Sequence, residues 1–396
     1  MQLKKIWIPI GSLLIVSLTL TACTGQKDRD LESALEGRNA VVRPEFNNLA
    51  ALNQEIDWMN APVEDNSLPV WEQAIDPEWI DTSQFAVEGN FTVCYSRGGE
   101  NSSWHEVGYN TMKHEVALHP EIEEFISVDA KGSNEKQIID IENLLAGGNC
   151  DVLIVSPNSS AALIPVVEQA CEQMPVVIFE RNILTDCPVT FVQPIGNYAF
   201  GIEGANFIAD NMPDGGIVLA FRTFPSIAVY EKRWIGAREV FREHPRFTVI
   251  GVEFTEDYAP QAKSITENYI NRFGQIDAIW MDSATTTLAV ISAFEEAGLD
   301  IPIMSVEDRQ SFLQKWNTED LTAIAPTFPT FQWRTAVIAA VKIMHGEPVP
   351  ARWVLPQPAV TQNNLDYFDL ETMPSGHYAM CGCENMPGYP EDWGGQ

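Results

Sequence analysis

Short apolar segments recur along the chain from Phe91 onward and alternate with amphipathic ones. Each short apolar segment predicts a strand that is buried on both faces. The predicted strands are Phe91–Tyr95, Phe125–Val128, Val152–Val155, Val176–Phe179, Ile217–Phe221, Val249–Phe254, Ala278–Met281 and Ile301–Val306. Helical periodicity fills the gaps between them; residues 134–146, for example, place Ile138, Ile141 and Leu145 on one face and stop at two glycines.

This alternation predicts the fold class. A strand and a helix that follow each other about every 25 to 35 residues are typical of a parallel α/β sheet. So many strand–helix units in a chain of 396 residues favour two doubly wound lobes over one closed barrel, although periodicity alone is compatible with both. We therefore expect an α/β protein with two doubly wound parallel-sheet lobes.

The N-terminal segment predicts export. Lys4 and Lys5 precede an apolar segment, residues 6–20, that is short for a membrane span, so residues 1–22 are interpreted as a secretory signal peptide. The sequence Leu-Thr-Ala-Cys that ends at Cys23 resembles the lipobox of bacterial lipoproteins, which implies a lipid on Cys23. The alternative is an ordinary signal peptide with an incidental cysteine. We expect a protein of the periplasm or outer cell surface that is tethered to the membrane by its lipid.

Residues 23–85 form a separate, polar part of the sequence. Four prolines interrupt it, and one amphipathic helix is indicated by Leu49, Leu52, Ile56 and Met59. Its three tryptophans would be costly to expose, which argues against a purely disordered leash. We interpret residues 23–85 as a lipidated tether and an extension that lies against the body of the protein.

The net charge indicates which binding partners are unfavourable, and the cysteine content indicates the cellular compartment. A formal net charge of −31 makes nucleic acid a poor partner, and 45% hydrophobic residues exclude disorder. Six cysteines besides Cys23 fit an oxidising compartment, and we expect a disulfide between Cys171 and Cys187. Cys94 lies in an apolar segment, which predicts a buried thiol. The tail pair at 381 and 383 is interpreted as a disulfide or free thiols, with no metal and no cofactor expected.

The residues that follow the predicted strands are the candidates for binding, because ligands of such sheets lie beyond the carboxyl ends of the strands. These positions carry guanidinium groups, carboxylates and flat aromatic rings, which together suit a ligand with many hydroxyls and C–H faces, as a sugar has. The candidate ligand-binding residues are Asn101, Ser103, Trp104, Glu180, Arg181, Arg233, Tyr258, Asp282, Ser283 and Glu307.

Plainer structural roles compete with binding at three of these positions. Trp104 opens a helix and could belong to the core. Arg181 could merely pair with Glu180 or with a surface carboxylate. Arg233 follows Glu231 and Lys232 and could lie on a solvated helix face.

At these residues the chain resembles the sugar-binding branch of type I periplasmic binding proteins, the ribose-binding protein group. The resemblance covers residues 91–355. Asn101, Ser103 and Trp104 occupy the family's Asn and two aromatic positions after the first strand, and Ser156-Pro157 ends the third strand as the family's Ser-Pro does. Later in the chain, Glu180-Arg181 occupies the place of the family's Asp-Arg pair, and Arg233, followed by Gly236, resembles the Arg of its Arg-x-x-Gly segment. Tyr258 lies near the family's second-lobe aromatic residue, Asp282-Ser283 occupies its Asn-bearing strand end, and Glu307 the place of its late Asp.

The resemblance implies a fold and a function. The two lobes would be joined by a hinge with crossings near Pro194, Pro326 and Pro350, which divides the chain into 86–194 plus 328–350 and 195–327 plus 351–396. For the family's hinge Gln, Gln332 and Thr327 align about equally well. The sequence departs from the family's pattern at four positions. Glu180 and Glu307 replace the shorter Asp, Ser283 replaces an amide, and Ser103 replaces an aromatic residue, so the resemblance does not identify a specific sugar.

The resemblance also implies a monomer that binds a carbohydrate and hands it to an ABC-type permease. A sugar sensor that presents the same pocket to a signalling partner is the alternative, and an extracellular α/β hydrolase is a further one. No nucleophile elbow, phosphate-binding loop or dinucleotide fingerprint occurs in the sequence. His114 and His119 miss the zinc spacing, because five residues turn a helix by about 500° and leave the rings about 140° apart. A transcription repressor of the related fold is disfavoured, because the chain is acidic and carries a predicted signal peptide.

Overall fold

The computed structural model describes residues 43–99, 102–390 and 393. The predicted signal peptide, Cys23 and Asn101 lie outside these residues. Within the described ranges, no helix is both long enough and apolar enough to cross a membrane.

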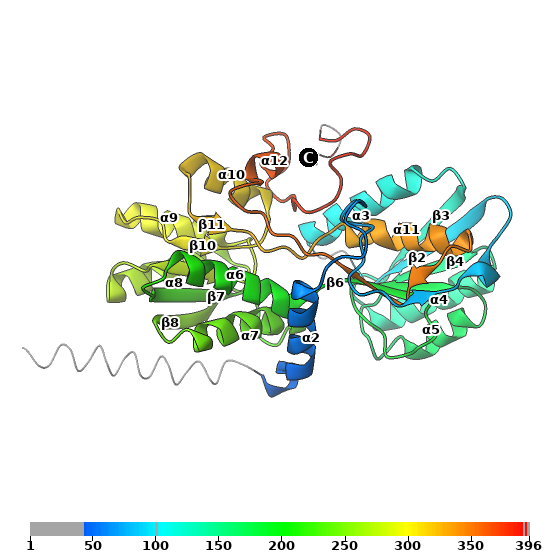
Figure 1. The fold of residues 1–396 in the computed structure, drawn as a ribbon, viewed down its shortest axis with the longest axis horizontal. Helices are drawn as coiled ribbons and strands as arrows, with labels where there is room; N and C mark the ends of the chain where they lie inside the picture. The colour runs from blue at the N-terminus through cyan, green and yellow to red at the C-terminus, as the bar shows by residue number, and fades with distance from the viewer. Residues whose placement is uncertain (1–42, 100–101, 391–392, 394–396) are drawn as a thin grey trace, which may run out of the picture. The chain divides into compact units, whose positions relative to one another are not determined.

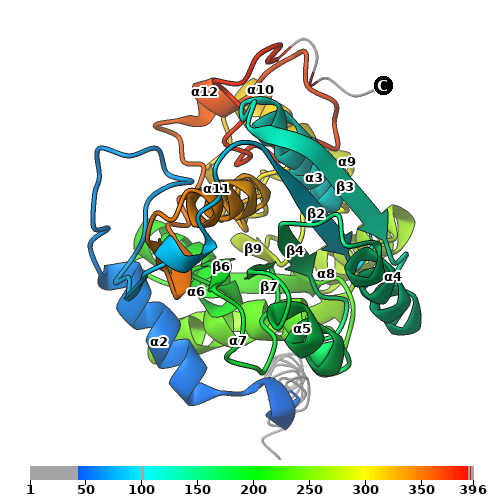
Figure 2. The same cartoon turned by 90° about the vertical axis from the view of Figure 1, so that its right-hand side faces the viewer.

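The first lobe is built on a parallel sheet of six strands, in the order β13-β6-β5-β4-β2-β3. Its strands are β2 (Phe91–Arg97), β3 (Ile122–Asp129), β4 (Val152–Ser156), β5 (Val176–Phe179), β6 (Thr190–Pro194) and β13 (Arg352–Leu355). Helices α4 (Asn134–Gly147) and α5 (Ile164–Cys171) share a core with one face, and α3 (Ser103–Ala117) and α11 (Gln332–Met344) cover the other (Figure 2).

The second lobe repeats this arrangement with five parallel strands, in the order β11-β10-β9-β7-β8. They are β7 (Gly216–Arg222), β8 (Phe247–Phe254), β9 (Ala278–Met281), β10 (Ile303–Ser305) and β11 (Ala323–Ile324). Helices α6 (Asn197–Asn211) and α7 (Ala228–Glu243) share a core with one face. Helices α8 (Ala259–Phe273) and α9 (Thr287–Ala297) lie on the other face, and α10 (Gln310–Glu319) packs beside α9 (Figure 1).

Both lobes are therefore doubly wound, as the apolar pattern predicted. Each of the eight predicted strands is present. To the two large sheets the structure adds β6, β11 and β13, which the pattern missed because β11 is only two residues long and the other two mix polar with apolar residues.

The chain crosses between the lobes at residues 195–196, at 325–331 and again after β13. Gln357 connects the three crossings: its side-chain amide donates to the carbonyl oxygens of Thr327, at 2.6 Å, and of Gly196, at 3.1 Å, while its oxygen accepts from the N–H of Gly196 at 2.9 Å. Of the two residues considered for the hinge position, Thr327 lies in the second crossing, whereas Gln332 is the first residue of α11. The third crossing was predicted near Pro350, but β13 pairs with β6 in the first lobe, so residues 352–355 do not belong with the second.

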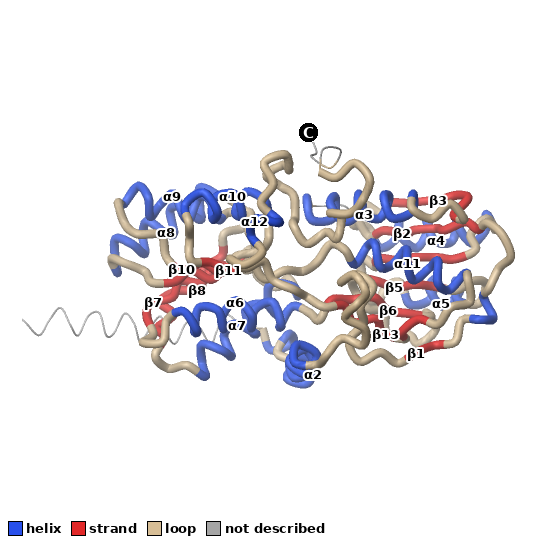
Figure 3. Tube along the Cα trace, turned by 45° about the horizontal axis from the view of Figure 1, so that its top comes forward, coloured by secondary structure: helices blue, strands red, loops and turns tan. Residues whose placement is uncertain are grey.

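Two segments outside the lobes run beside them (Figure 3), and each contacts both lobes. We call residues 43–85 the extension. It contains the 3₁₀ turn η1 (Pro44–Phe46), α2 (Leu49–Asn60), β1 (Trp79–Ile80) and η2 (Ser83–Phe85). Helix α2 packs into the core of the second lobe. Further on, Trp71 lies under the guanidinium of Arg334 in α11, and β1 pairs with β12 (Val349–Pro350) in the first lobe.

We call the residues after 355 the tail. Its short helix α12 (Leu365–Phe368) packs on α10 of the second lobe. Beyond α12, the carbonyl oxygen of His377 accepts from the N–H of Gln310, the first residue of α10, and the carbonyl oxygen of Met380 accepts from the N–H of Thr330 in the second crossing. Its last residues share a small core with Val107 of α3. The tail therefore links the two lobes a further time.

The structure pairs six cysteines. Cys171 pairs with Cys187 across the α5–β5 region, as the sequence led us to expect. Cys94 pairs with Cys150, so it is not a free thiol; the strand that carries it lies beside the loop before β4. Cys381 pairs with its near neighbour Cys383.

Candidate ligand-binding cleft

A cavity of about 650 Å³ lies where the carboxyl ends of both sheets face the crossings. Side chains from both lobes, from the second crossing and from α2 line it. Six of the predicted binding residues border this cavity, namely Trp104, Glu180, Arg181, Arg233, Ser283 and Glu307. The carboxyl ends of parallel strands at a change of strand order are the usual position of ligand sites in such folds.

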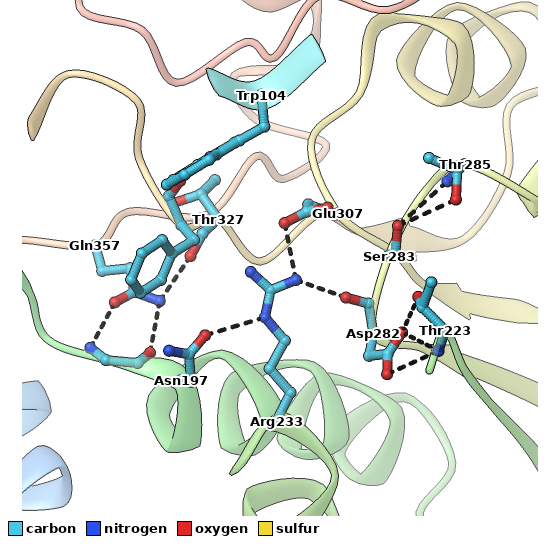
Figure 4. A network of polar contacts seen from close by, with 12 residues as sticks. Trp104, Asn197, Thr223, Arg233, Asp282, Ser283, Thr285, Glu307, Thr327 and Gln357 are labelled. Carbon is cyan, nitrogen blue, oxygen red and sulfur yellow. Dashed lines mark hydrogen bonds and ion pairs between the residues drawn. The ribbon is translucent and has the colours of Figure 1, made fainter. Parts of the chain in front are cut away.

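Arg233 of α7 is the centre of the polar contacts in the cavity (Figure 4). It is only 4% exposed. Its Nη1 donates to Glu307 Oε1 at 2.8 Å and to the backbone oxygen of Asp282 at 2.5 Å, and its Nε donates to Asn197 Oδ1 at 3.3 Å. The guanidinium also lies 3.9 Å from the ring centre of Phe200. Arg233 is therefore held rigidly, and it is not on a solvated helix face.

An aromatic wall faces these charges. Trp104 is in the first turn of α3, and its indole N–H donates to the backbone oxygen of Phe328 at 2.8 Å. The Trp104 ring meets Trp333 edge-on, with centres 4.7 Å apart, and Phe328 at 5.8 Å. The half-buried Trp104 thus borders the cavity with its position fixed by the second crossing, so its role is not simply that of a core residue.

Glu180 directly follows β5 and has a left-handed backbone, with φ of 68°. A non-glycine residue in this region stores strain, which surrounding contacts must hold in place. Its carboxylate accepts from Ser156 Oγ at 2.6 Å and lies 3.7 Å from His105 Nε2 and 3.4 Å from Arg181 Nε. Burial raises the pKa of Glu180, but the contacts with His105, Arg181 and Ser156 outweigh it and hold the pKa below its usual value. Glu180 is therefore an ionised acceptor at the cavity.

Three predicted positions do not border the cavity. Asp282 turns its carboxylate toward Thr223, whose N–H donates at 2.9 Å and whose hydroxyl donates at 2.7 Å. Burial raises the pKa of Asp282 to about 7. Tyr258 is 59% exposed at the start of α8, where its neighbour Asp257 borders the cavity instead. Ser103 faces the tail at Gly376.

These differences have a common cause. The sequence shows which residues follow a strand, but the direction of each side chain depends on the conformation of the loop. Asp282 is still part of the site through its backbone oxygen, which Arg233 contacts.

Sequence reasoning missed several residues that border the cavity. They are His105, Asn197, Tyr230, Asp257, Thr285, Phe328 and Tyr378 from the lobes and the tail, and Glu55 and Trp58 from α2. Helical spacing could have found Tyr230, because it lies one turn before Arg233 on the same helix face. Nothing in the sequence indicated that α2 would reach the site.

Two groups of histidines and cysteines in the described residues resemble metal sites. His114 stacks on Trp393, whereas His119 lies beyond the end of α3 and its Nε2 is 2.9 Å from Glu115 Oε1, so the two rings have different partners. His377, Cys381 and Cys383 come close enough to hold an ion. Their two sulfurs are bonded to each other, however, and a disulfide offers no thiolate ligand.

Comparison with protein families gives one match that covers most of the chain. The model of the periplasmic binding protein domain family matches residues 97–348. Among curated proteins, the ribose import binding protein RbsB of Bacillus subtilis (strain 168) is 24% identical over 276 residues, which cover 69% of this chain and 88% of that protein.

Solved structures show the same fold. An ABC transporter solute binding protein from Bacillus halodurans C-125, solved with bound myo-inositol, aligns with a TM-score of 0.60 and 22% identity over 72% of this chain and 98% of that one. A periplasmic solute binding protein from Actinobacillus succinogenes 130z, with bound D-allose, aligns with a TM-score of 0.59 and 18% identity over 70% and 100%. The extension and the tail lie outside the family match.

Proposed function

Because this chain belongs to the periplasmic binding protein domain family, we propose that it captures a carbohydrate between its two lobes and delivers it to an ABC-type permease. The observation that carries the proposal is the cavity in which an aromatic wall, Trp104 and Phe328, faces the ion pair of Arg233 and Glu307. A sugar presents apolar C–H faces to rings and hydroxyls to charged groups, and this cavity offers both. The curated relative and the two solved neighbours carry sugar or cyclitol ligands in their names.

Each side chain has a distinct role in the proposed complex. Trp104 covers one face of the sugar ring. Glu180 and Glu307 accept hydrogen bonds from hydroxyls, and Arg181 and Arg233 donate to hydroxyl or ring oxygens. The rigid contacts of Arg233 mean that little side-chain order is lost on binding, which favours affinity.

Closure of the lobes would complete the site. Periplasmic binding proteins as a class close two lobes about a hinge when a ligand binds, and the proposal takes this motion from the family. The physical requirement is that the ligand binds the closed arrangement better than the open one. The cavity is suited to this requirement, because Glu180 and Trp104 come from the first lobe and Arg233 and Glu307 come from the second. A ligand that contacts all four residues would hold the two lobes together.

The proposal extends to the envelope of the cell. A lipid on Cys23 would keep the protein beside its permease after removal of residues 1–22. An exported location agrees with the three cysteine pairs, because disulfides persist in oxidising compartments. Labelling of growing cells with radioactive palmitate tests the anchor: the wild type should incorporate the label and the Cys23→Ser variant should not, and an unlabelled wild type would refute it.

Calorimetric titration of the mature protein with D-ribose, D-xylose, D-allose, D-glucose and myo-inositol tests the binding step. We expect one or more to bind, and Arg233→Ala to abolish that binding. Tyr258→Ala is the matched control, since Tyr258 follows a strand of the same lobe but does not border the cavity. Failure of every sugar, polyol and glycoside to bind would refute the carbohydrate proposal.

Transport and sensing are separated by a cellular assay. If the protein serves a permease, deletion of its gene abolishes uptake of the labelled ligand, and a lipid-anchored copy restores it. If it serves a sensor instead, uptake persists and only the response to the ligand is lost. Turnover of a bound sugar by the purified protein would favour the hydrolase.

A further inference from the structure

The cavity does not end at Arg233. It continues past Asn197 and Gly196 and reaches α2 of the extension, where Gln54, Glu55 and Trp58 border it. Gln193 and Arg352 of the first lobe border the same end. Because α2 lies outside residues 97–348, this end of the cavity is built by a part of the chain that the family match does not include. We call it the α2 end.

Specific contacts fix α2 against the second lobe. Glu55 Oε2 accepts from the backbone N–H of Ala199 at 2.9 Å, in the first turn of α6. Its carboxyl group lies so close to Gly196 that a Cβ there would be 2.1 Å from Glu55 Cδ, and the φ of 149° at Gly196 also requires glycine. The hydroxyl of Tyr198 donates to the backbone oxygen of Phe46, just before α2, at 2.5 Å. The α2 end is therefore a preformed wall.

The side chains at the α2 end have the chemistry of a sugar site. Trp58 is half-buried and offers an indole ring, with the guanidinium of Arg352 at 5.9 Å from its centre. Within the part of the chain that the structure describes, the side-chain amides of Gln54 and Gln193 make no hydrogen bond to protein, so both can bind a ligand. An aromatic ring beside free amides fits the C–H face and the hydroxyls of a second ring.

The size of the cavity agrees with a ligand larger than one ring. At about 30 Å³ for each water molecule of the liquid, 650 Å³ holds about twenty waters, and a single sugar ring replaces only some of them. A monosaccharide placed between Trp104 and Arg233 leaves the α2 end filled with water.

We propose that the ligand is a glycoside or disaccharide, with one ring between Trp104 and Arg233 and a second unit on the α2 end against Trp58, Gln54 and Gln193. This inference rests on the proposed function and names the ligand class more closely. The extension is then a specificity element of the binding site as well as a structural support.

Calorimetry with matched pairs tests the proposal: D-xylose with xylobiose, D-glucose with maltose, and myo-inositol with galactinol. We expect at least one glycoside to bind tenfold or more tightly than its monosaccharide or cyclitol. The double variant Gln54→Ala/Gln193→Ala should lower the affinity for that glycoside about tenfold, as two lost hydrogen bonds imply, and leave the affinity for the smaller partner unchanged. Both side chains lack protein partners within the described residues, so the variant is expected to fold.

Asn53→Ala is the matched control, because Asn53 is exposed on the same helix and does not border the cavity. If the single-ring compounds bind and no glycoside binds more tightly, the α2 end is not a sugar subsite and only this inference fails. The same conclusion follows if a glycoside binds more tightly but the double variant affects it no more than Asn53→Ala does. If no compound of either size binds, the proposed function fails as well.

Discussion

Replacing Glu55 by glutamine should change how the stability of the protein depends on pH. Burial raises the pKa of Glu55 from 4.5 to about 7, against the opposing effects of the Ala199 N–H and the charge of Lys232. The folded protein therefore holds this proton more tightly than the unfolded chain does. The tighter binding of this proton stabilises the folded protein fully below pH 4.5, and this stabilisation is lost as the pH rises through 7.

The size of the effect follows from the shift in pKa. With about 1.36 kcal/mol for each pKa unit, a group that titrates at 4.5 unfolded and near 7 folded costs about 2.5 kcal/mol of stability between pH 5 and pH 8. The Glu55→Gln side chain is neutral at every pH and keeps an oxygen that can accept from Ala199. Relative to the wild type, the variant should therefore gain about 2.5 kcal/mol over this interval.

Urea unfolding at pH 5, 6, 7 and 8, followed by tryptophan fluorescence, measures this difference. Hydrogen exchange at the Ala199 amide gives a local measurement of the same contact, and its protection in the wild type should vary over the same pH range. Asp57→Asn serves as control, because Asp57 lies on the same helix and does not border the cavity. Parallel stability profiles for wild type and Glu55→Gln would refute the reasoning, since Glu55 would then be ionised in the fold at no cost.

Three further changes test other parts of the structure. Arg233→Ala should lower the free energy of unfolding by about 3–5 kcal/mol besides abolishing sugar binding, because it leaves the buried Glu307 unpaired. The double variant Arg233→Ala/Glu307→Gln should recover most of the lost stability but none of the binding. An unchanged urea midpoint for Arg233→Ala alone would contradict the expected destabilisation. Gln357→Ala should cost about 1–3 kcal/mol, since it leaves backbone groups of two crossings unpaired, and unfolding with normal stability would argue against that role. Cys171→Ser should cost about 3 kcal/mol by opening a short loop, as the melting of oxidised protein would show; equal melting of variant and wild type would mean that this pair does not form.

The candidate site was partly predictable because parallel sheets place strand ends together. Trp104, Glu180 and Arg233 lie far apart in the sequence, yet all three border the cavity. Tyr258 shows the limit of that reasoning: it is close to a strand end, but the left-handed backbone of the two preceding residues turns Asp257 toward the cavity. Loop conformation, which a pattern of apolar residues does not encode, decides between such neighbours.

The hinge and the extension illustrate the same limit over longer distances. Gln357 follows β13, a strand whose parallel pairing with β6 is not visible in local patterning. Glu55 reaches the N-terminus of α6 across a sequence separation of 144 residues. Such contacts depend on how whole elements pack, and the residues involved carry no local signal of their partners.

The order of strands and helices, the doubly wound class and the polar residues at the strand ends follow from the amino-acid sequence, because hydrophobic periodicity and short connections are local properties. Three features depend on the tertiary structure: the direction of the Asp282 carboxylate, the hydrogen bonds by which Gln357 joins the three crossings, and the contribution of α2 to the lining of the cavity. The physical reason is that burial and long-range hydrogen bonds act between segments that only folding brings together. In this protein those contacts decide the shape of the cavity.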